Sequence, residues 1–292
     1  MSVDLGLLLK SGLDAWRRNR NLCVPFILNF FLTIAAALVF VMILVFAFFG
    51  DVLPALAFNA TNESSAALIG ETVMPRLRNA LFPLAIGAGI FAVIVTALSS
   101  FFDAGATGMA SKALSGGKCT VDDMVKAGSK RFLSVFAARL VIYALVSIGA
   151  VFLVAGFLVY GGNPAVDIDK ILSSPSPERP NVFIGMLPKL APLLVGAFAW
   201  AMYAVVITIL FSLVVYSIVV DETSSLGGIK KALGVFMKNK LDVLLLWLFT
   251  TSVFVSLWFV SEVIFQVPVA GIAWVIVHYS ILLFVLQPLY AV

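Results

Sequence analysis

Two ionisable side chains stand inside apolar stretches of the sequence, and they are its first candidates for chemistry. Glu262 lies near the end of one hydrophobic run, and His278, the single histidine of the chain, lies within the next. An ionisable group within a membrane span is costly and by default marks a functional site. Because a carboxylate favours the protonated form of a neighbouring imidazole, a Glu262–His278 pair would form a proton-sensitive site.

The sequence leaves a second interpretation of these residues open. His278 would then bond a backbone carbonyl or a hydroxyl, and Glu262 would reach the outer lipid head groups. A lone His and Glu lack the further ligands of a catalytic metal site, and Cys23 and Cys119 stand alone in the sequence. With no nucleophile or paired-carboxylate pattern either, the sequence predicts no enzymatic activity, no metal and no cofactor.

Clusters of Lys and Arg before three of the hydrophobic runs form the second group of candidates. Each Lys or Arg near an anionic membrane surface contributes about 1 kcal/mol of attraction. We therefore predict contacts with anionic lipid head groups or an acidic protein partner, although the rule that places positive charge inside would account for the same residues. The candidates are Lys10, Arg17, Arg18, Arg20, Lys126, Lys130, Lys230, Lys231, Lys238 and Lys240. Arg139, at the inner end of a span, is expected to extend to the membrane interface.

The composition identifies the class of protein that must position these residues. The chain has 292 residues, of which 62% are hydrophobic and 12% are charged, whereas a soluble domain has about 25% charged residues. It is therefore predicted to be an integral membrane protein, and its long apolar runs favour helices over a barrel. The basic residues lie beside apolar runs rather than on one domain face, so nucleic acid is not an expected partner.

The hydrophobic pattern predicts an all-α, polytopic fold with six transmembrane helices in a single membrane domain, residues 1–292. Proline and polar residues indicate outer connections at 50–79 and 161–191, and Ser115 to Gly117 break the chain on the inner side. The approximate spans are 22–49, 81–102, 140–160, 193–220, 243–264 and 272–289.

Three shorter amphipathic helices are predicted to lie at the inner membrane interface. The first covers residues 2–20, the second follows an N-cap at Thr120, and the third covers Leu226 to Leu241 with a break near Asn239. Because most Lys and Arg lie on the side of these helices, that side and both termini are predicted to be cytoplasmic in a multi-pass protein of the cell membrane.

The three amphipathic helices share a pattern that predicts a threefold internal repeat, with units of about 1–112, 113–221 and 222–292. In each copy a small residue stands two positions after a Lys, and an aromatic residue stands four positions after the small one. The copies are Lys10, Gly12 and Trp16, then Lys126, Gly128 and Phe132, then Lys230, Ala232 and Phe236. Arg17-Arg18-Asn19-Arg20 corresponds to Met237-Lys238-Asn239-Lys240, whereas the middle copy has Leu133-Ser134-Val135-Phe136. Basic inner loops of any membrane protein would produce part of this match.

One stretch also resembles a known group. Gly-Gly-Ile-Lys-Lys-Ala-Leu-Gly-Val-Phe-Met-Lys-Asn-Lys at 227–240, preceded by Val219-Val220-Asp221-Glu222, resembles six-helix prokaryotic and archaeal membrane proteins of unknown function. These are related to the membrane domain of glycerophosphodiester phosphodiesterases and distantly to Yip-type membrane proteins. The resemblance implies a membrane-organising or lipid-associated role, and it transfers no catalytic residue because the hydrolase domain of those enzymes is a separate soluble domain.

Two functions are consistent with these features. The first is a non-enzymatic protein that organises the membrane or serves as a scaffold or subunit of a complex, with anionic lipid, a protein partner or a second copy of the chain as the expected partners. The alternative is a transporter of a small molecule or lipid, with its pathway between the repeats and Glu262 and His278 as the coupling pair.

Overall fold

The computed structural model describes residues 5–50, 74–161 and 179–291, and within these ranges the regular elements are helices without strands. The predicted all-α fold is confirmed. Five helices are long and apolar enough to cross a membrane, and a shorter apolar helix covers Ala273–Leu289. The five are Arg20–Phe48, Phe82–Leu114, Val121–Tyr160, Leu187–Val219 and Lys240–Phe265.

In chain order, the elements are α1 (Leu5–Arg18), the 3-10 helix η1 (Arg20–Cys23), α2 (Val24–Phe49), α5 (Met74–Leu114), α6 (Val121–Ile148), α7 (Ala150–Tyr160), α9 (Arg179–Leu210), α10 (Val214–Val219), α11 (Ser225–Lys238), α12 (Lys240–Phe265), α13 (Pro268–Ile281), the π-helix η3 (Leu282–Leu286) and α14 (Gln287–Ala291). Several of these helices begin at residues that favour a helix start. At α6, Thr120 and Asp123 form a capping box, and at α11 the Ser224 hydroxyl accepts the Gly227 N–H.

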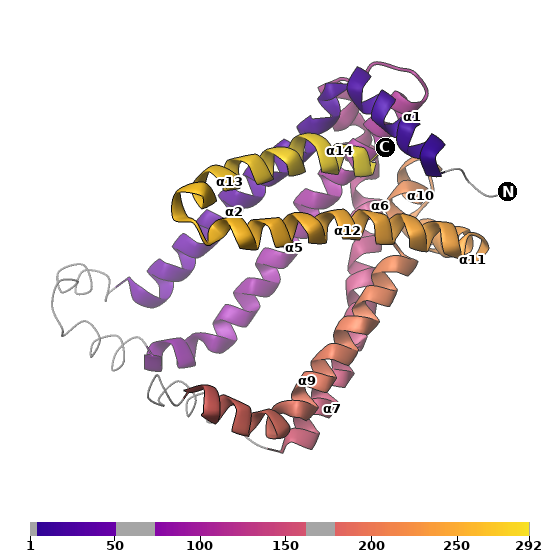
Figure 1. The fold of residues 1–292 in the computed structure, drawn as a ribbon. Coiled ribbons are helices and arrows are strands. Elements are labelled where there is room, and N and C mark those ends of the chain that lie inside the picture. The colour runs from indigo at the N-terminus through magenta and orange to yellow at the C-terminus, as the bar shows by residue number, and fades with distance from the viewer. Residues whose placement is uncertain (1–4, 51–73, 162–178, 292) are drawn as a thin grey trace.

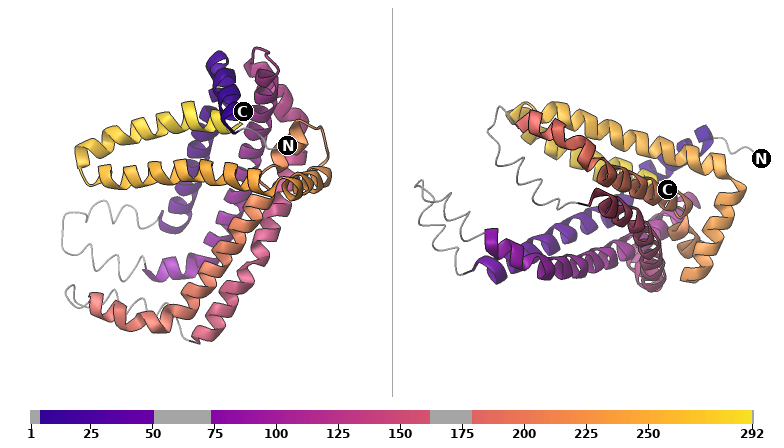
Figure 2. Two further views of the ribbon diagram at one scale, coloured as in Figure 1. Left: turned by 45° about the vertical axis from the view of Figure 1, so that its right-hand side comes forward. Right: turned by 90° about the horizontal axis from the view of Figure 1, so that it is seen from below.

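The most extensive contact between two helices is that of α5 with α6, and three further pairs of neighbours are α2 with α5, α7 with α9, and α12 with α13. Figures 1 and 2 show α2 with α5, α6 and α7 with α9, and α12 with α13 diverging from a common end of the molecule, where α1, α11 and the C-terminus lie. Away from that end, large apolar side chains such as Phe46, Phe82, Leu158 and Val263 are exposed. A lipid environment explains this surface, because it would be unfavourable in water.

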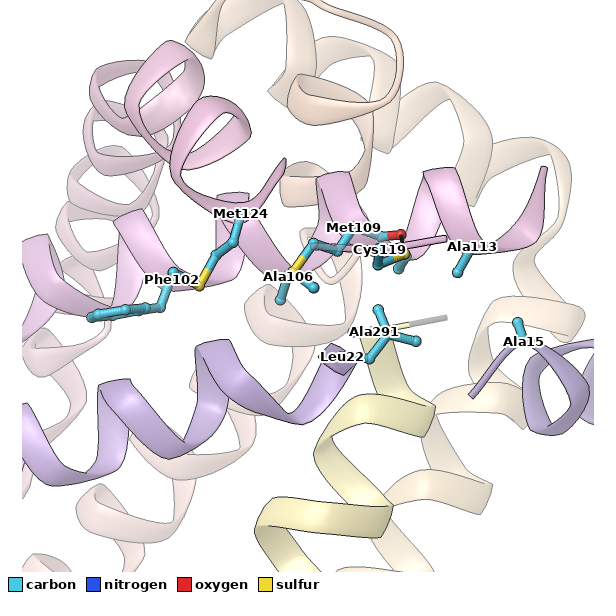
Figure 3. Close-up of a cluster of buried hydrophobic side chains, with 10 residues drawn as sticks. Ala15, Leu22, Phe102, Ala106, Met109, Ala113, Cys119, Met124 and Ala291 are labelled. Atoms are coloured by element: carbon cyan, nitrogen blue, oxygen red, sulfur yellow. Dashed lines mark hydrogen bonds between the residues drawn. The ribbon is translucent and has the colours of Figure 1, made fainter. Parts of the chain in front are cut away.

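Buried residues concentrate at the common end in two clusters. The first joins α5, the α5–α6 turn and α6 to the N- and C-terminal segments, and Figure 3 shows its side chains converging; it comprises Ala15, Leu22, Phe102, Ala106, Met109, Ala110, Ala113, Cys119, Met124 and Ala291. The second packs α5, α6, α10 and α11; it comprises Ala104, Val135, Ala138, Val214, Ile218, Val219 and Ala232. The two buried hydrophobic clusters therefore lie at one end of the molecule.

Glycines allow the closest approaches between helices. A Cβ atom at Gly108 would lie 2.3 Å from the Ala127 Cβ, and one at Gly156 would lie 2.5 Å from the Pro192 carbonyl oxygen. Small residues at such positions let helix backbones approach closely in membranes. They hold α5 against α6 and α7 against α9.

The structure differs from the sequence prediction at the second amphipathic helix. Residues from Val121 to Ile148 form one continuous helix, so the amphipathic segment is the first part of a long helix and not a separate element. The residues at the aligned positions explain this difference. In the first and third copies a helix ends beside Asn19 or Asn239. The middle copy has Val135 at that position, and this valine is fully buried within the continuous helix.

Two further differences concern helix ends. The predicted outer connection 161–191 is wrong for its last part, because α9 begins at Arg179 and contains Pro188 and Pro192. Pro180 lies in the first turn, where a missing backbone N–H removes no helical bond. The predicted connections otherwise fall largely on 51–73 and 162–178, which lie outside the described residues. The fourth span is also interrupted, since α9 ends at Leu210 and α10 begins at Val214.

Candidate functional site

The basic end of the molecule is the candidate site, and we define it as α1, η1, the α5–α6 turn, the start of α6, the α10–α11 turn and α11. Its segments are joined by three sets of polar contacts. The first set links the N-terminal segment to the α5–α6 turn. The Cys119 N–H donates to the Asn19 Oδ1 at 3.0 Å, and the Asn21 Nδ2 donates to the Cys119 carbonyl at 2.9 Å. Burial raises the pKa of the Cys119 thiol, whose Sγ donates to the Met109 carbonyl.

The second set joins α6 to the α10–α11 turn through one carboxylate. Glu222 Oε1 lies 2.6 Å from Lys130 Nζ, and its Oε2 lies 2.9 Å from an Arg131 guanidinium nitrogen. Hydrogen bonds and charge from Lys130 and then Arg131 lower the pKa of Glu222. Glu222 has φ 54, in the left-handed region, so the backbone turns sharply where it presents this carboxylate.

The third set joins α1 and η1 to the π-helix η3. The Trp16 Nε1 donates to the Phe284 carbonyl at 2.9 Å, and the Cys23 Sγ donates to the same oxygen at 3.3 Å. In an α-helix this oxygen would pair with the N–H of the residue four positions on, which is Pro288, and proline has none, so these two side chains supply donors to it. Sequence reasoning missed this contact, and Pro288 within the last apolar run was its signal.

The two basic junctions have the same local structure. Asn19 has φ −130 and ψ 68, and Asn239 has φ −126 and ψ 44. Each side-chain amide donates to the carbonyl four residues earlier at 3.2 Å, that of Ala15 in the first junction and that of Val235 in the third. The predicted break near Asn239 is confirmed.

Three of the basic residues predicted to contact lipid or a partner form ion pairs with acidic residues of the chain. Lys126 pairs with Asp122 at 2.6 Å on the same helix, Lys130 pairs with Glu222, and Lys231 pairs with Asp221 at 2.9 Å. These charges are compensated locally, so they contribute less to a field that would attract an anion.

The remaining predicted basic residues are exposed, and none forms an ion pair with another residue of the described ranges. They lie on α1, η1, α11 and the start of α12, and five of them are within two residues of Asn19 or Asn239. This unpaired set comprises Lys10, Arg17, Arg18, Arg20, Lys230, Lys238 and Lys240.

Arg139 has a partner that the sequence did not indicate. Its guanidinium forms an ion pair with Asp103 of α5, and the two side chains are 19% and 30% exposed. A pair that links neighbouring helices explains this arginine better than extension to the interface does. The antiparallel packing of α5 and α6, which brings the two residues together, could not be seen in the order of residues alone.

The predicted intramembrane pair is not formed as expected. Between Glu262 and His278 the described structure has no hydrogen bond or ion pair, and Glu262 is exposed. His278 instead contacts Ser261, the residue that precedes Glu262 in the chain, and the His278 Nδ1 lies 3.1 Å from the Ser261 Oγ. The second interpretation, a histidine bonded to a hydroxyl, therefore describes His278. Among the described residues, no group of three or more His, Cys, Asp or Glu could hold a metal ion.

Comparison with known proteins finds a weak similarity in sequence. No protein-family model matches the chain, and no solved structure matches it. The chain is 27% identical over 250 residues to an uncharacterised protein of Archaeoglobus fulgidus, covering 82% of this chain and 76% of that protein. The chain is thus a multi-pass helical membrane protein with weak similarity to an archaeal protein of undescribed function.

Proposed function

We propose that this is a non-enzymatic integral membrane protein whose basic end binds anionic lipid head groups, and that it thereby organises the membrane or serves as a scaffold or subunit of a complex. In this proposal α1, the start of α6 and α11 are cytoplasmic interfacial segments, and both termini are cytoplasmic in the cell membrane. The proposal agrees with the role implied by the resemblance to membrane domains of glycerophosphodiester phosphodiesterases.

A sixth span belongs to the proposal. The segments α13, η3 and α14 follow one another from Pro268 to Ala291, which at about 1.5 Å per residue is roughly 35 Å, enough for a bilayer core of about 30 Å. Hydrogen bonds from Trp16 and Cys23 to Phe284 bring its end to the N-terminal helix, in support of termini on one side.

The threefold repeat also belongs to the proposal. Each proposed unit contributes one of the three helix pairs, and the aligned small residues Gly12, Gly128 and Ala232 are all buried. The matching conformations of Asn19 and Asn239 support an equivalence of the first and third units. The middle unit departs from them through its continuous helix.

The observation that carries the function is the division of the basic residues into paired and unpaired sets. The acidic residues of this end compensate Lys126, Lys130 and Lys231. The unpaired set is left exposed beside the apolar spans, where lipid phosphates would lie. With about 1 kcal/mol for each such charge, three lysines contribute on the order of 3 kcal/mol of preference for anionic lipid.

The test measures the anionic lipid that remains bound to the protein after purification, by mass spectrometry. The triple variant K230Q/K238Q/K240Q should retain severalfold less anionic lipid than the wild type, and K230R/K238R/K240R should retain it. The matched control D122N/K126Q/D221N/K231Q removes two compensated pairs without a change of net charge, so it should retain lipid normally. Equal retention by the triple glutamine variant and the wild type would contradict the proposal.

Transport is a second candidate function, and a specific observation favours it. At the break between α9 and α10, Phe211 and Leu213 pack against the second buried cluster. That cluster contains Ala104 and Ala138, which are adjacent in the chain to the ion-paired Asp103 and Arg139. Interrupted helices and intramembrane charges are features of transporter sites. Flux through reconstituted vesicles that is lost in D103N, but kept by the lipid-retention variants, would favour transport over lipid organisation.

A further inference from the structure

A polar cluster of three side chains lies between α12 and α13. Trp274 and His278 are four residues apart on α13, so they lie on one face of that helix. Both face Ser261 of α12: the Trp274 Nε1 is 2.9 Å from the Ser261 Oγ, and the His278 Nδ1 is 3.1 Å from it. The serine is buried, and its Oγ also lies 2.8 Å from the Leu257 carbonyl oxygen.

The number of hydrogens in this cluster determines the state of His278. A serine hydroxyl has one hydrogen and two lone pairs, and an indole nitrogen can only donate. The serine hydrogen can go to the Leu257 carbonyl or to an unprotonated His278 Nδ1, and the shorter distance, 2.8 Å against 3.1 Å, assigns it to the carbonyl. Ser261 then accepts from Trp274 and from the His278 Nδ1–H, which satisfies every polar atom of the serine.

We propose that Ser261 holds the neutral His278 in the Nδ1–H tautomer, and that the free Nε2 is a proton-binding site within the membrane. In this tautomer the Nε2 carries the lone pair, and it has no hydrogen-bond partner among the described residues. A proton from the aqueous phase adds to the Nε2 while the Nδ1–H bond to Ser261 stays in place. The site can therefore change charge without rearranging the α12–α13 contact.

Few titratable groups surround this site. On α12 the neighbouring carboxylate is Glu262, which is exposed, and on α13 the phenol of Tyr279 has its ring centroid 5.5 Å from that of His278. Phe30 of α2 packs on Tyr279, but α2 contains no Asp, Glu, Lys, Arg or His, and neither does η3. This inference does not depend on lipid binding at the basic end.

The single histidine makes the test direct. The full chain is labelled with 15N-histidine, reconstituted in bilayers and examined by solid-state NMR between about pH 8 and pH 5. We expect the neutral imidazole to be protonated at Nδ1, and acidification to protonate Nε2 while the Nδ1–H signal remains. A neutral form protonated at Nε2, or an Nε2 that gains no proton over this range, overturns the proposal.

Variants separate the role of the serine from general packing. S261A should remove the preference for the Nδ1–H tautomer, so that an Nε2–H form becomes populated, and S261T should restore it because threonine keeps the hydroxyl. E262Q is the matched control, since it changes the adjacent residue, and it should leave the tautomer unchanged. A tautomer that is the same in S261A and the wild type would show that Ser261 does not set it.

Discussion

At the scale of single residues, small polar groups decide which segments meet. The three links at the basic end each use one acceptor or carboxylate: Asn19 for Cys119, Glu222 for Lys130 and Arg131, and the Phe284 carbonyl for Trp16. In an apolar chain such groups have few alternative partners, so each one specifies a contact.

Glu222 gives a prediction with a defined pH dependence. Its pKa is lowered in the folded protein, so its pairs stabilise the fold above the ordinary pKa of a glutamate, about 4.3, and this contribution is lost as the pH falls through the lowered value. E222Q should unfold at a lower temperature than the wild type at neutral pH, and the difference should shrink in acid. D122N, whose partner Lys126 is on the same helix, is the control and should show a smaller difference at neutral pH.

Pro288 gives a prediction about the free carbonyl. P288A restores an N–H that competes for the Phe284 oxygen, so the bonds from Trp16 and Cys23 should weaken. In a C119S background, Cys23 should then react faster with a maleimide. P83A, which changes an exposed proline within α5, should leave the rate unchanged. Equal rates in P288A and its parent would contradict this explanation of the contact.

The partner of His278 shows where residue-level prediction stops. Successive residues of a helix point about 100° apart, so Ser261 and Glu262 face different directions. The sequence of α12 is apolar on all sides and does not indicate which face meets α13. The presence of a polar contact at His278 could be predicted, but the identity of the partner required the packing.

At the scale of elements, the two asparagine junctions differ in their dependence on other units. Asn19 is 7% exposed and its side chain accepts the buried Cys119 N–H, whereas Asn239 is exposed and its side chain bonds the Val235 carbonyl of the preceding helix. N19A should lower the free energy of unfolding by about 1–3 kcal/mol because it leaves that N–H without a partner. N239A should cost about 0.5 kcal/mol or less. Equal losses in thermal or denaturant unfolding would contradict this difference.

The close helix crossings give a second prediction at this scale. In G156A the new Cβ would meet the backbone oxygen of Pro192, which cannot move aside, so we expect a loss of about 1–3 kcal/mol in the free energy of unfolding. G89A is the matched control because its Cβ would have nothing within 4 Å, and it should be neutral or stabilise by up to about 1 kcal/mol. A G156A protein as stable as the wild type would show that this crossing is not tight.

Local signals in the sequence predicted many element boundaries. Thr120 begins α6 through a capping box, and the chain bends at Asn239 as expected from its position between a basic amphipathic segment and an apolar run. The start of α9 at Arg179 was not predicted, because proline-rich stretches usually indicate loops. The contact of Trp16 with Phe284 joins residues 268 positions apart. Pro288 indicated a carbonyl that lacks its α-helical donor, but no local pattern could identify Trp16 as the partner.

At the scale of the whole molecule, the basic end both joins segments that are distant in the sequence and carries the proposed function. The two buried clusters lie there, while the diverging helix pairs expose apolar side chains along their lengths (Figure 1). The composition predicted a helical membrane protein correctly. The division of the basic residues into paired and unpaired sets depended on helix packing, which brings Glu222 to Lys130 and Arg131.

The most direct test of lipid binding at the basic end is photo-crosslinking in reconstituted bilayers with a phosphatidylglycerol analogue that carries the reactive group in its head. Mass spectrometry of the labelled peptides should locate the label near Arg17 to Arg20 and Lys238 to Lys240, and labelling should fall as salt is raised. A zwitterionic analogue should label these peptides much less. Equal labelling by the two analogues, or labelling concentrated at the opposite end of the helix pairs, would contradict the proposed function.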